Sequence, residues 1–292
     1  MTERPSTKEA NGVSPYAQEL LTYKECAELG PKSLPYVIEC AAVGKSLTYF
    51  GTSHPERDPQ NLEYGAIILA FRSAQPDIVF VEGLNGEQAA FDSRLKHLTH
   101  DKIIEQMGES GFMAKLAQEA EVPWRCPEPG DEEVITRQRE AGFTQSEIFS
   151  WFVMRMLPQY YRQMERTGFP AYVERFIQAF QKKTNWEGFD YSYEYALSYA
   201  EEELGRGIDV ENEPNFITVI EPTAMEYSDV PPTVFNRIGS ATSRFRDERI
   251  LTELIIALET YDRIFAVYGA THVEMQEPAL RKYFEDLDNK EG

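Results

Sequence analysis

The pattern of apolar and polar residues predicts a helix and a β-hairpin near the start of the chain, after a polar tail. Residues 1–13 are polar and show no periodicity, so they predict a flexible tail. A Ser-Pro pair at residues 14–15 is typical of a helix start, and the helical pattern ends at a Gly-Pro pair at residues 30–31. Two runs rich in β-branched and aromatic residues, at 36–43 and 47–50, then flank a Gly-Lys-Ser turn, which predicts a hairpin.

Helical and strand patterns alternate in the next part of the chain. Residues 61–74 have apolar side chains at helical spacing, and the run IVFV at 78–81 is typical of a strand buried on both faces. Helical patterns return over residues 88–121. Residues 122–125 predict a third strand, although their proline is a poor fit for the interior of a sheet.

A long helical segment follows, and it is rich in aromatic residues. Nothing from 132 to 207 predicts a strand, while 144–167 and 171–183 have the pattern of amphipathic helices. Residues 151–199 carry 14 of the 36 aromatic residues of the chain. They either fill the core of a helical subdomain or line a cleft over the active face, and the sequence leaves both open. The acidic run at 201–213 predicts a solvated loop.

The last part returns to alternating elements, with a helix at 243–261, a strand at 263–268 and a helix at 273–284. Strand and helix therefore alternate on both sides of the helical segment. We predict an α/β fold with a mixed, largely parallel central sheet flanked by helices and a large helical insertion. The predicted organisation is a flexible tail at 1–13, the first part of the core at 14–130, the insertion at 131–235 and the second part of the core at 236–292.

The charge of the chain excludes several classes of function. Its 29 Lys and Arg against 49 Asp and Glu give a formal net charge of −20. Such a surface repels phosphate backbones and acidic lipids, and no Lys/Arg cluster reverses this field, so we expect no binding to nucleic acid or membranes. The same field favours neutral or cationic substrates over polyanions.

The sequence also predicts a cytoplasmic protein. The first twenty residues hold no apolar run like a signal-peptide core, and apolar stretches such as 66–71 are too short to span a bilayer. The three cysteines, Cys26, Cys40 and Cys126, have no C-x-x-C spacing. This fits a reducing compartment better than a disulfide framework or a thiolate metal site.

Two of the four histidines share a local pattern. His54 and His272 each lie in a G-x-[S/T]-H-x-E segment, at 51–56 and 269–274, directly after a predicted strand. Each segment has the S/T-x-x-E spacing of a capping box, so we expect a helix to begin there with the histidine at its first position. The positive end of the helix dipole would then keep the imidazole neutral, which is the form that binds metal or acts as a base.

A carboxylate follows the buried strand between these segments. Glu82 comes directly after residues 78–81. In open α/β sheets the binding crevice lies at the carboxyl ends of the strands, so we expect His54, Glu82 and His272 to converge on one edge. Two imidazoles and one carboxylate are a common ligand set for a catalytic divalent ion, such as Mn, Co or Zn. Alternatively, Glu82 acts as a general base with the histidines and without a metal.

Three more charged residues are candidates. Arg57 is expected either to bind a substrate anion or to orient Glu82, or else to be an ordinary surface residue. Arg249 is expected either to reach the site, where it or Arg57 would stabilise a developing oxyanion, or to belong to a solvated charged turn. Glu128, just after the third predicted strand, is a candidate second carboxylate. The chain has no G-x-S-x-G, P-loop or Rossmann glycine motif, so a serine-hydrolase or nucleotide site has no support.

Four strings in the sequence carry a resemblance to a known family. They are YFGTSH at 49–54, DIVFVEG at 77–83, RDERILTELIIALE at 246–259 and RIFAVYGATH at 263–272. With them the chain resembles the TraB/Tiki (PrgY/GumN) family, within the superfamily of erythromycin esterases and ChaN-like proteins. That superfamily is marked by two G-x-x-H motifs and a glutamate after the second core strand, which here match His54, His272 and Glu82.

The resemblance is limited to the two parts of the predicted core, about residues 36–85 and 243–285. The E-R-N-like helix start of the group matches Glu248 and Arg249, but Ile250 stands where asparagine is expected. The resemblance implies an α/β core with a helical insertion. It implies a metal-dependent peptidase for Tiki-like members, water activation by histidine and glutamate without a required metal for esterase-like members, and haem binding for ChaN-like members.

Together the motifs and the resemblance predict a hydrolase that acts on a peptide or small-molecule substrate. Water would be activated at a site made by His54, Glu82 and His272, and a divalent ion held by these three residues would lower the pKa of its bound water. Arg57 or Arg249 would stabilise the oxyanion. The alternative is a non-catalytic binding or regulatory protein that uses the same crevice for a peptide, a haem or a protein partner.

Overall fold

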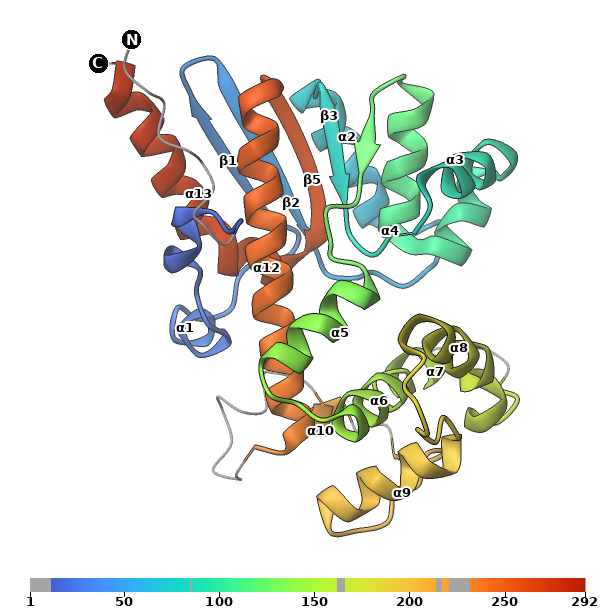
Figure 1. The fold of residues 1–292 in the computed structure, drawn as a ribbon. Helices are drawn as coiled ribbons and strands as arrows, with labels where there is room; N and C mark the ends of the chain where they lie inside the picture. Colours follow the sequence, from blue (N-terminus) through green and yellow to red (C-terminus); the bar gives the residue numbers. More distant parts are fainter. Residues whose placement is uncertain (1–11, 85, 162–165, 214–216, 221–231, 292) are drawn as a thin grey trace. The chain divides into compact units, whose positions relative to one another are not determined.

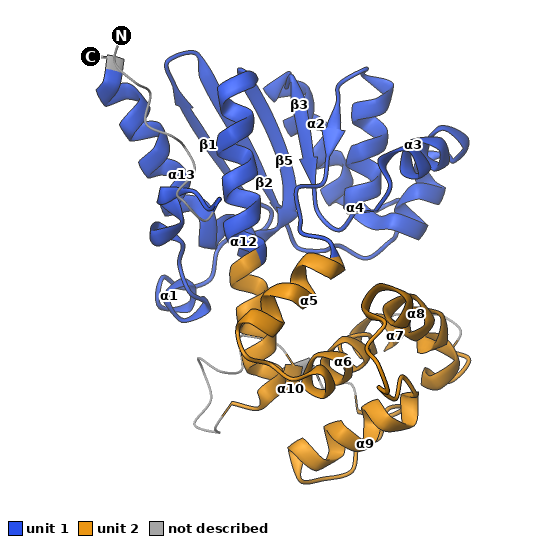
Figure 2. Cartoon of the chain, viewed as in Figure 1, with its two compact units in different colours: residues 1–130, 246–292 blue, residues 131–245 orange. Residues whose placement is uncertain are grey.

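The computed structural model describes residues 12–84, 86–161, 166–213, 217–220 and 232–291. Most of the predicted tail, residues 1–13, lies outside these ranges. The chain divides into two compact units (Figure 2). Unit 1 comprises Met1–Gly130 and Arg246–Gly292, and unit 2 comprises Asp131–Phe245.

Unit 1 is built on a five-stranded sheet with the strand order β1-β2-β5-β3-β4 (Figure 1). The strands are β1 (Tyr36–Ala42), β2 (Lys45–Thr52), β3 (Ile78–Val81), β4 (Trp124–Arg125) and β5 (Arg263–Gly269). The hairpin strands β1 and β2 pair antiparallel, and every other neighbouring pair is parallel. The predicted α/β fold with a mixed, largely parallel sheet is therefore confirmed, and so is the predicted hairpin.

Helices cover both faces of this sheet (Figure 1). They are the 3₁₀ helix η1 (Pro15–Glu19), α1 (Tyr23–Glu28), α2 (Leu62–Ala74), α3 (Gln88–His97), α4 (His100–Glu119), α12 (Val234–Thr260, in unit 1 from Arg246 on) and α13 (Ala270–Glu291). One buried cluster joins one sheet face to η1, α12 and α13, and a second joins the other face to α2, α3 and α4.

Strands β3 and β5 lie in the interior of the sheet, and this position explains why their sequences are almost entirely apolar. All four residues of β3 are buried, and so are six of the seven residues of β5. Because both faces of these strands lie under helices, neither face can be polar. The first polar side chain after β3 therefore appears only where the strand leaves the sheet, at Glu82.

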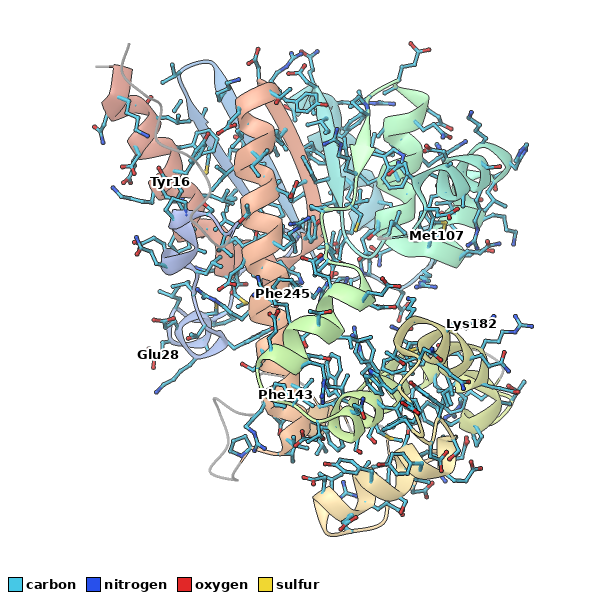
Figure 3. The ribbon with its side chains drawn as sticks, in the orientation of Figure 1. Tyr16, Glu28, Met107, Phe143, Lys182 and Phe245 are labelled. Atoms are coloured by element: carbon cyan, nitrogen blue, oxygen red, sulfur yellow. The ribbon has the colours of Figure 1, made fainter. Side chains whose placement is uncertain are left out.

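Unit 2 is entirely helical in the part of it that the structure describes. Its helices are α5 (Asp131–Glu140), α6 (Gln145–Met154), α7 (Leu157–Tyr161), α8 (Phe169–Thr184), α9 (Tyr193–Leu204), α10 (Ile217–Ile220) and the start of α12. All 14 aromatic residues of 151–199 lie in its buried core or pack against that core, and side chains fill the space between its helices (Figure 3). Of the two open interpretations of these aromatics, the packing supports the core of a subdomain.

Several boundaries differ from the sequence prediction. The first helix is interrupted, because Thr22 and Glu25 form a capping box that starts α1. The predicted helix at 144–167 is divided into α6 and α7, and α9 extends into the predicted loop as far as Leu204. The second boundary between the units falls at Arg246 instead of 236, because α12 passes through it without a break. A continuous helix gives no composition signal at such a boundary.

None of the helices in the described ranges is long and apolar enough to cross a membrane.

Candidate active site

The two histidine turns and Glu82 meet at one edge of the sheet in unit 1. Strands β2 and β5 are parallel neighbours, with Thr52 opposite Gly269, and β3 pairs with β5 on its other side. All three strands therefore end at the same edge. The structure brings the three predicted residues together, with 3.9 Å between His54 Nε2 and Glu82 Oε2 and 3.5 Å between His272 Nε2 and Glu82 Oε1.

The glycines of the two motifs allow the turns to approach each other closely. A Cβ atom on Gly51 would lie 2.6 Å from the carbonyl oxygen of Tyr36 and 2.9 Å from the Cα atom of Ala270, at the start of the other turn. A Cβ atom on Gly269 would lie 2.4 Å from Nε2 of His54. Each glycine thus leaves room for atoms of the opposite turn, because glycine has no Cβ atom and lets another segment approach its backbone closely.

His272 is a buried histidine with a buried carboxylate partner. It lies in the first turn of α13, and its Nδ1 atom is 2.7 Å from Oδ1 of Asp247 on α12. Asp247 is fully buried and also accepts a hydrogen bond from the amide of Gln276 at 2.7 Å. Burial lowers the pKa of His272, but the charge and hydrogen bond of Asp247 and the charge of Glu82 outweigh it and raise the pKa to about 10. His272 is therefore an imidazolium at neutral pH.

His54 is half exposed and lies in a loop. Its side chain is 51% exposed and its backbone adopts the left-handed conformation, with φ 52°. Its Nδ1 atom is 2.6 Å from Oε1 of Glu109 on α4. The hydrogen bond with Glu109 raises the pKa of His54, against the opposite effect of burial. Because an ionised carboxylate only accepts hydrogen bonds, Nδ1 carries the proton and Nε2 is the atom available for chemistry.

The predicted capping boxes are absent from both turns. Helix α2 begins at Leu62 with Asn61 as its N-cap, and Ser53 donates instead to Glu63, from its backbone N–H at 2.9 Å and its hydroxyl at 2.5 Å. In the second turn the helix already begins at Ala270, so Thr271 lies inside it. The expected neutral form is also wrong for His272, because the neighbouring carboxylates affect its pKa more strongly than a helix N-terminus does; the pKa of His54 is raised as well, by its hydrogen bond with Glu109.

Glu82 is held as an ionised carboxylate. Its side chain is 16% exposed, its Oε2 atom accepts the backbone N–H of Gly269 at 2.7 Å, and its Oε1 atom accepts from Arg246 Nη2 at 3.3 Å. Burial raises its pKa, but His272, Arg246 and His54 together lower it well below the usual range of a glutamate. A carboxylate of so low a pKa is a weak base, so its place in the site suits orientation better than proton abstraction.

Arg246 is the arginine that the structure brings to Glu82. It also pairs with Glu128, whose side chain is 6% exposed and accepts the backbone N–H of Gly83 at 3.3 Å. The candidate second carboxylate, Glu128, therefore does belong to this edge. Glu128 binds Arg246. Among the described contacts it forms no ion pair with His54 or His272.

Two predicted residues make other contacts. Arg57 donates from Nη1 to the backbone carbonyl of Gln106 at 3.1 Å. Arg249 pairs with Glu253 along α12 at 3.6 Å. The structure thus brings neither Arg57 nor Arg249 to Glu82. Arg249 lies almost one helical turn beyond Arg246, the arginine that does reach Glu82.

The sequence contained a signal for some of the residues that were missed. Arg246 and Asp247 belong to the string RDERILTELIIALE, but a string with two arginines does not tell which one faces the sheet edge. Glu109 lies in the middle of a helical pattern and is 55 residues away from its partner His54. The only hint at its position is the preceding Gly108, since an isolated glycine within a helical pattern often marks a local irregularity.

The donor chemistry of this edge fits a divalent ion, although the spacing does not yet form a ligand set. Both histidines bind a carboxylate through Nδ1 and direct Nε2 toward Glu82, the arrangement that orients metal-ligating imidazoles. Among the described residues, however, no group of three or more His, Cys, Asp or Glu side chains is arranged so that it could hold a metal ion.

A separate cavity of about 830 Å³ lies beside β4. Its lining includes Asp92 of α3, Gln118 of α4, Trp124 and Cys126, and it contains none of the residues that surround Glu82. Asp92 accepts the indole N–H of Trp124 at 3.0 Å and fixes this wall. The candidate active site is therefore defined by its charges and hydrogen bonds and not by this cavity.

Comparisons of the chain with protein-family models, with curated proteins and with solved structures found no match. The interpretation of the site consequently depends on the residues and on their geometry.

Proposed function

We propose that this chain is a hydrolase in which His54, Glu82 and His272 activate a water molecule for attack on an ester or peptide bond. One observation carries the proposal. The Nε2 atoms of two histidines from separate turns face the two oxygens of a single carboxylate, at 3.9 and 3.5 Å. These separations are too long for good direct hydrogen bonds and suit a bridging water.

His54 is the general base in this proposal. Its ring is half exposed, its Nδ1 atom is held by a carboxylate, and its Nε2 atom has no hydrogen-bond partner among the described residues. A substrate can therefore reach it. In the reaction, the water oxygen attacks the carbonyl carbon while one water proton passes to Nε2 of His54. The bond to the leaving group then breaks, and the same proton passes from His54 to that group.

His272 and Glu82 have different tasks. As a buried imidazolium, His272 offers an N–H donor and a positive charge beside the developing oxyanion, in surroundings that exclude most water. Glu82 accepts a hydrogen bond from the water and keeps it between the two rings. Two histidines with different surroundings thus provide the base and the electrostatic stabilisation, a division of labour that enzymes often make by shifting pKa values.

Metal-dependent hydrolysis is the second candidate. It is supported by the two Nδ1–carboxylate pairs, which leave the Nε2 atoms of His54 and His272 and the carboxylate of Glu82 as donors. A divalent ion held by these three residues would supply a bound water of lowered pKa. The two Nδ1–carboxylate contacts, of His54 with Glu109 and of His272 with Asp247, would still set the orientation of both rings.

The resemblance to the TraB/Tiki family supports both versions of this proposal, and the three free cysteines support a cytoplasmic location for the protein. The rival class remains a binding or regulatory protein that holds a peptide, a haem or a protein partner at the same edge. That class predicts ligand binding without turnover.

The test is a hydrolysis screen of chelator-treated protein on p-nitrophenyl esters and fluorogenic peptides, with and without added Mn, Co or Zn. We expect turnover that falls about 10²- to 10⁴-fold in His54→Gln, the usual contribution of a general base. His97→Gln, which changes an exposed histidine, is the matched control. Turnover that requires an added ion would favour the metal-dependent version. No turnover under any condition, or equal rates in both variants, would overturn the proposal.

A further inference from the structure

Helix α4 contains a break whose position is unusual. At Gly108 the backbone has φ 62° and ψ −153°, although helical residues continue on both sides. This region of backbone conformation is accessible almost only to glycine, and it interrupts the hydrogen bonds of the helix. A strained conformation of this kind persists where the surrounding structure fixes it, and such sites cluster around functional residues.

The residue after the break reaches the candidate base. Glu109 has a side chain that is only 12% exposed, and its Oε1 atom is 2.6 Å from Nδ1 of His54. The hydroxyl of Thr52 donates to the same Oε1 atom at 3.5 Å and accepts the backbone N–H of His54 at 3.4 Å. Both the ring and the backbone of His54 are therefore tied to Glu109 and Thr52.

Arg57 binds a backbone carbonyl next to the break. It donates from Nη1 to the carbonyl of Gln106 at 3.1 Å, and its Nε atom would lie 3.7 Å from a Cβ atom on Gly108. Arg57 belongs to the same loop as His54, so its hydrogen bond ties this loop to α4 beside the break.

From these contacts we propose that the break at Gly108 makes Glu109 a positioning residue for His54. The proposal rests on the hydrolase function proposed above. His54 has a left-handed backbone and a half-exposed ring, and without a partner such a ring would sample several rotamers. Glu109 holds one of them, with the proton on Nδ1 and with Nε2 toward Glu82.

The alternative is that the break serves only the packing of α4, where Met107, labelled in Figure 3, precedes Gly108. The side chain of Met107 would lie 2.3 Å from a Cβ atom on Gly111, so this part of the helix is indeed tightly packed. A break that serves packing alone would tolerate the loss of the charge of Glu109. Glu109→Gln therefore separates the two explanations, because it keeps the size of the side chain and can donate from its amide to Nδ1, which favours the wrong tautomer.

The experiment compares Glu109→Gln with Glu105→Gln, which removes an exposed carboxylate one helical turn earlier that pairs only with Lys102 among the described contacts. The first readout is the imidazole ¹⁵N spectrum at neutral pH, which needs no substrate. We expect Glu109→Gln to shift the signals of His54 and to leave those of His97 unchanged. The second readout is hydrolysis, where we expect kcat to fall about 10- to 100-fold with little change in KM. Glu105→Gln should change neither readout.

The two readouts keep this inference separate from the proposed function. If the wild-type protein hydrolyses nothing, the function fails, and the spectrum still tests the pairing of Glu109 with His54. If His54 keeps its signals in Glu109→Gln, or if kcat is unchanged while the protein is active, the positioning role is overturned. Gly108→Ala provides a second variant for the same spectrum, and we expect it to shift His54 in the same way because it moves Glu109.

Discussion

The two G-x-[S/T]-H-x-E turns have nearly the same local sequence and very different structures. The turn after β2 continues as a loop, and the His54 side chain is 51% exposed. The turn after β5 passes directly into α13, and the His272 side chain is 11% exposed. Each ring receives its carboxylate from a different helix, Glu109 of α4 or Asp247 of α12. The local pattern thus determines where a histidine lies, and distant residues determine its orientation and charge.

The first prediction compares the loss of each histidine and has the largest expected effect. His272→Ala leaves the fully buried Asp247 without its cationic partner, so we expect the free energy of unfolding to fall by about 3–5 kcal/mol. His54→Ala removes a half-exposed ring and leaves Glu109 with Thr52 as a donor, so we expect a smaller loss of about 1–2 kcal/mol. Denaturant unfolding of both variants measures the difference. Equal losses would contradict the distinction between a buried and an accessible turn.

The second prediction compares the first glycine of each turn. A Cβ atom on Gly51 would meet backbone atoms of Tyr36 and Ala270, which cannot move independently, so Gly51→Ala should destabilise the fold by about 1–3 kcal/mol. A Cβ atom on Gly269 would meet the ring of His54, which can rotate away into solvent. Gly269→Ala should therefore reduce hydrolysis more than stability. Thermal unfolding and kcat are measured for both variants. A larger loss of stability in Gly269→Ala than in Gly51→Ala would contradict these contacts.

The third prediction concerns the dependence of stability on pH. The pKa of His272 is about 10 in the folded protein and about 6.5 in an unfolded chain, so the folded state binds more protons between these values. Its contribution is complete below pH of about 6.5 and is lost as the pH rises toward 10. We expect the free energy of unfolding to fall as the pH rises through this window. The free energy of unfolding should depend less steeply on pH in His272→Gln. An unchanged pH dependence in that variant would show that His272 is not its cause.

The smallest predicted effect concerns the third residue of each turn. The hydroxyl of Ser53 donates to Glu63 at 2.5 Å, so Ser53→Ala should cost about 0.5–1 kcal/mol of unfolding free energy. Thr271 is exposed inside the first turn of α13 and makes no side-chain contact among the described hydrogen bonds, so Thr271→Ala should cost almost nothing. If Thr271 were the N-cap of a capping box, its loss would cost about 1 kcal/mol. Denaturant unfolding of the pair decides between these arrangements.

The sequence predicted those parts of the fold that depend on continuous burial. The strand at 78–81 and the strand at 263–268 after its first residue, Arg263, are apolar because helices cover both of their faces, and such runs can be recognised in the sequence alone. The meeting of His54, Glu82 and His272 followed from the rule that parallel strands end at the same edge.

The parts that could not be predicted depend on long-range contacts. The left-handed backbone of His54 and the reach of Glu109 both result from the break in α4, which no local pattern specifies. The choice of Arg246 over Arg249 depends on how α12 is placed along its own axis against the sheet, since residues three apart share a helix face. The sign of the pKa shifts was wrong for the same reason, because the carboxylates that cause them come from distant segments.

The account is tested most directly by the imidazole ¹⁵N spectrum of Glu82→Gln, because the central claim is that two separate turns converge on this one carboxylate. The chain has only four histidines, so each signal can be assigned by substitution. Glu119→Gln, which should shift only His100, and Glu56→Gln, which should shift none, are the controls. We predict that Glu82→Gln shifts the signals of both His54 and His272. A spectrum in which only one of them moves, or neither, would contradict the convergence and with it the proposed site.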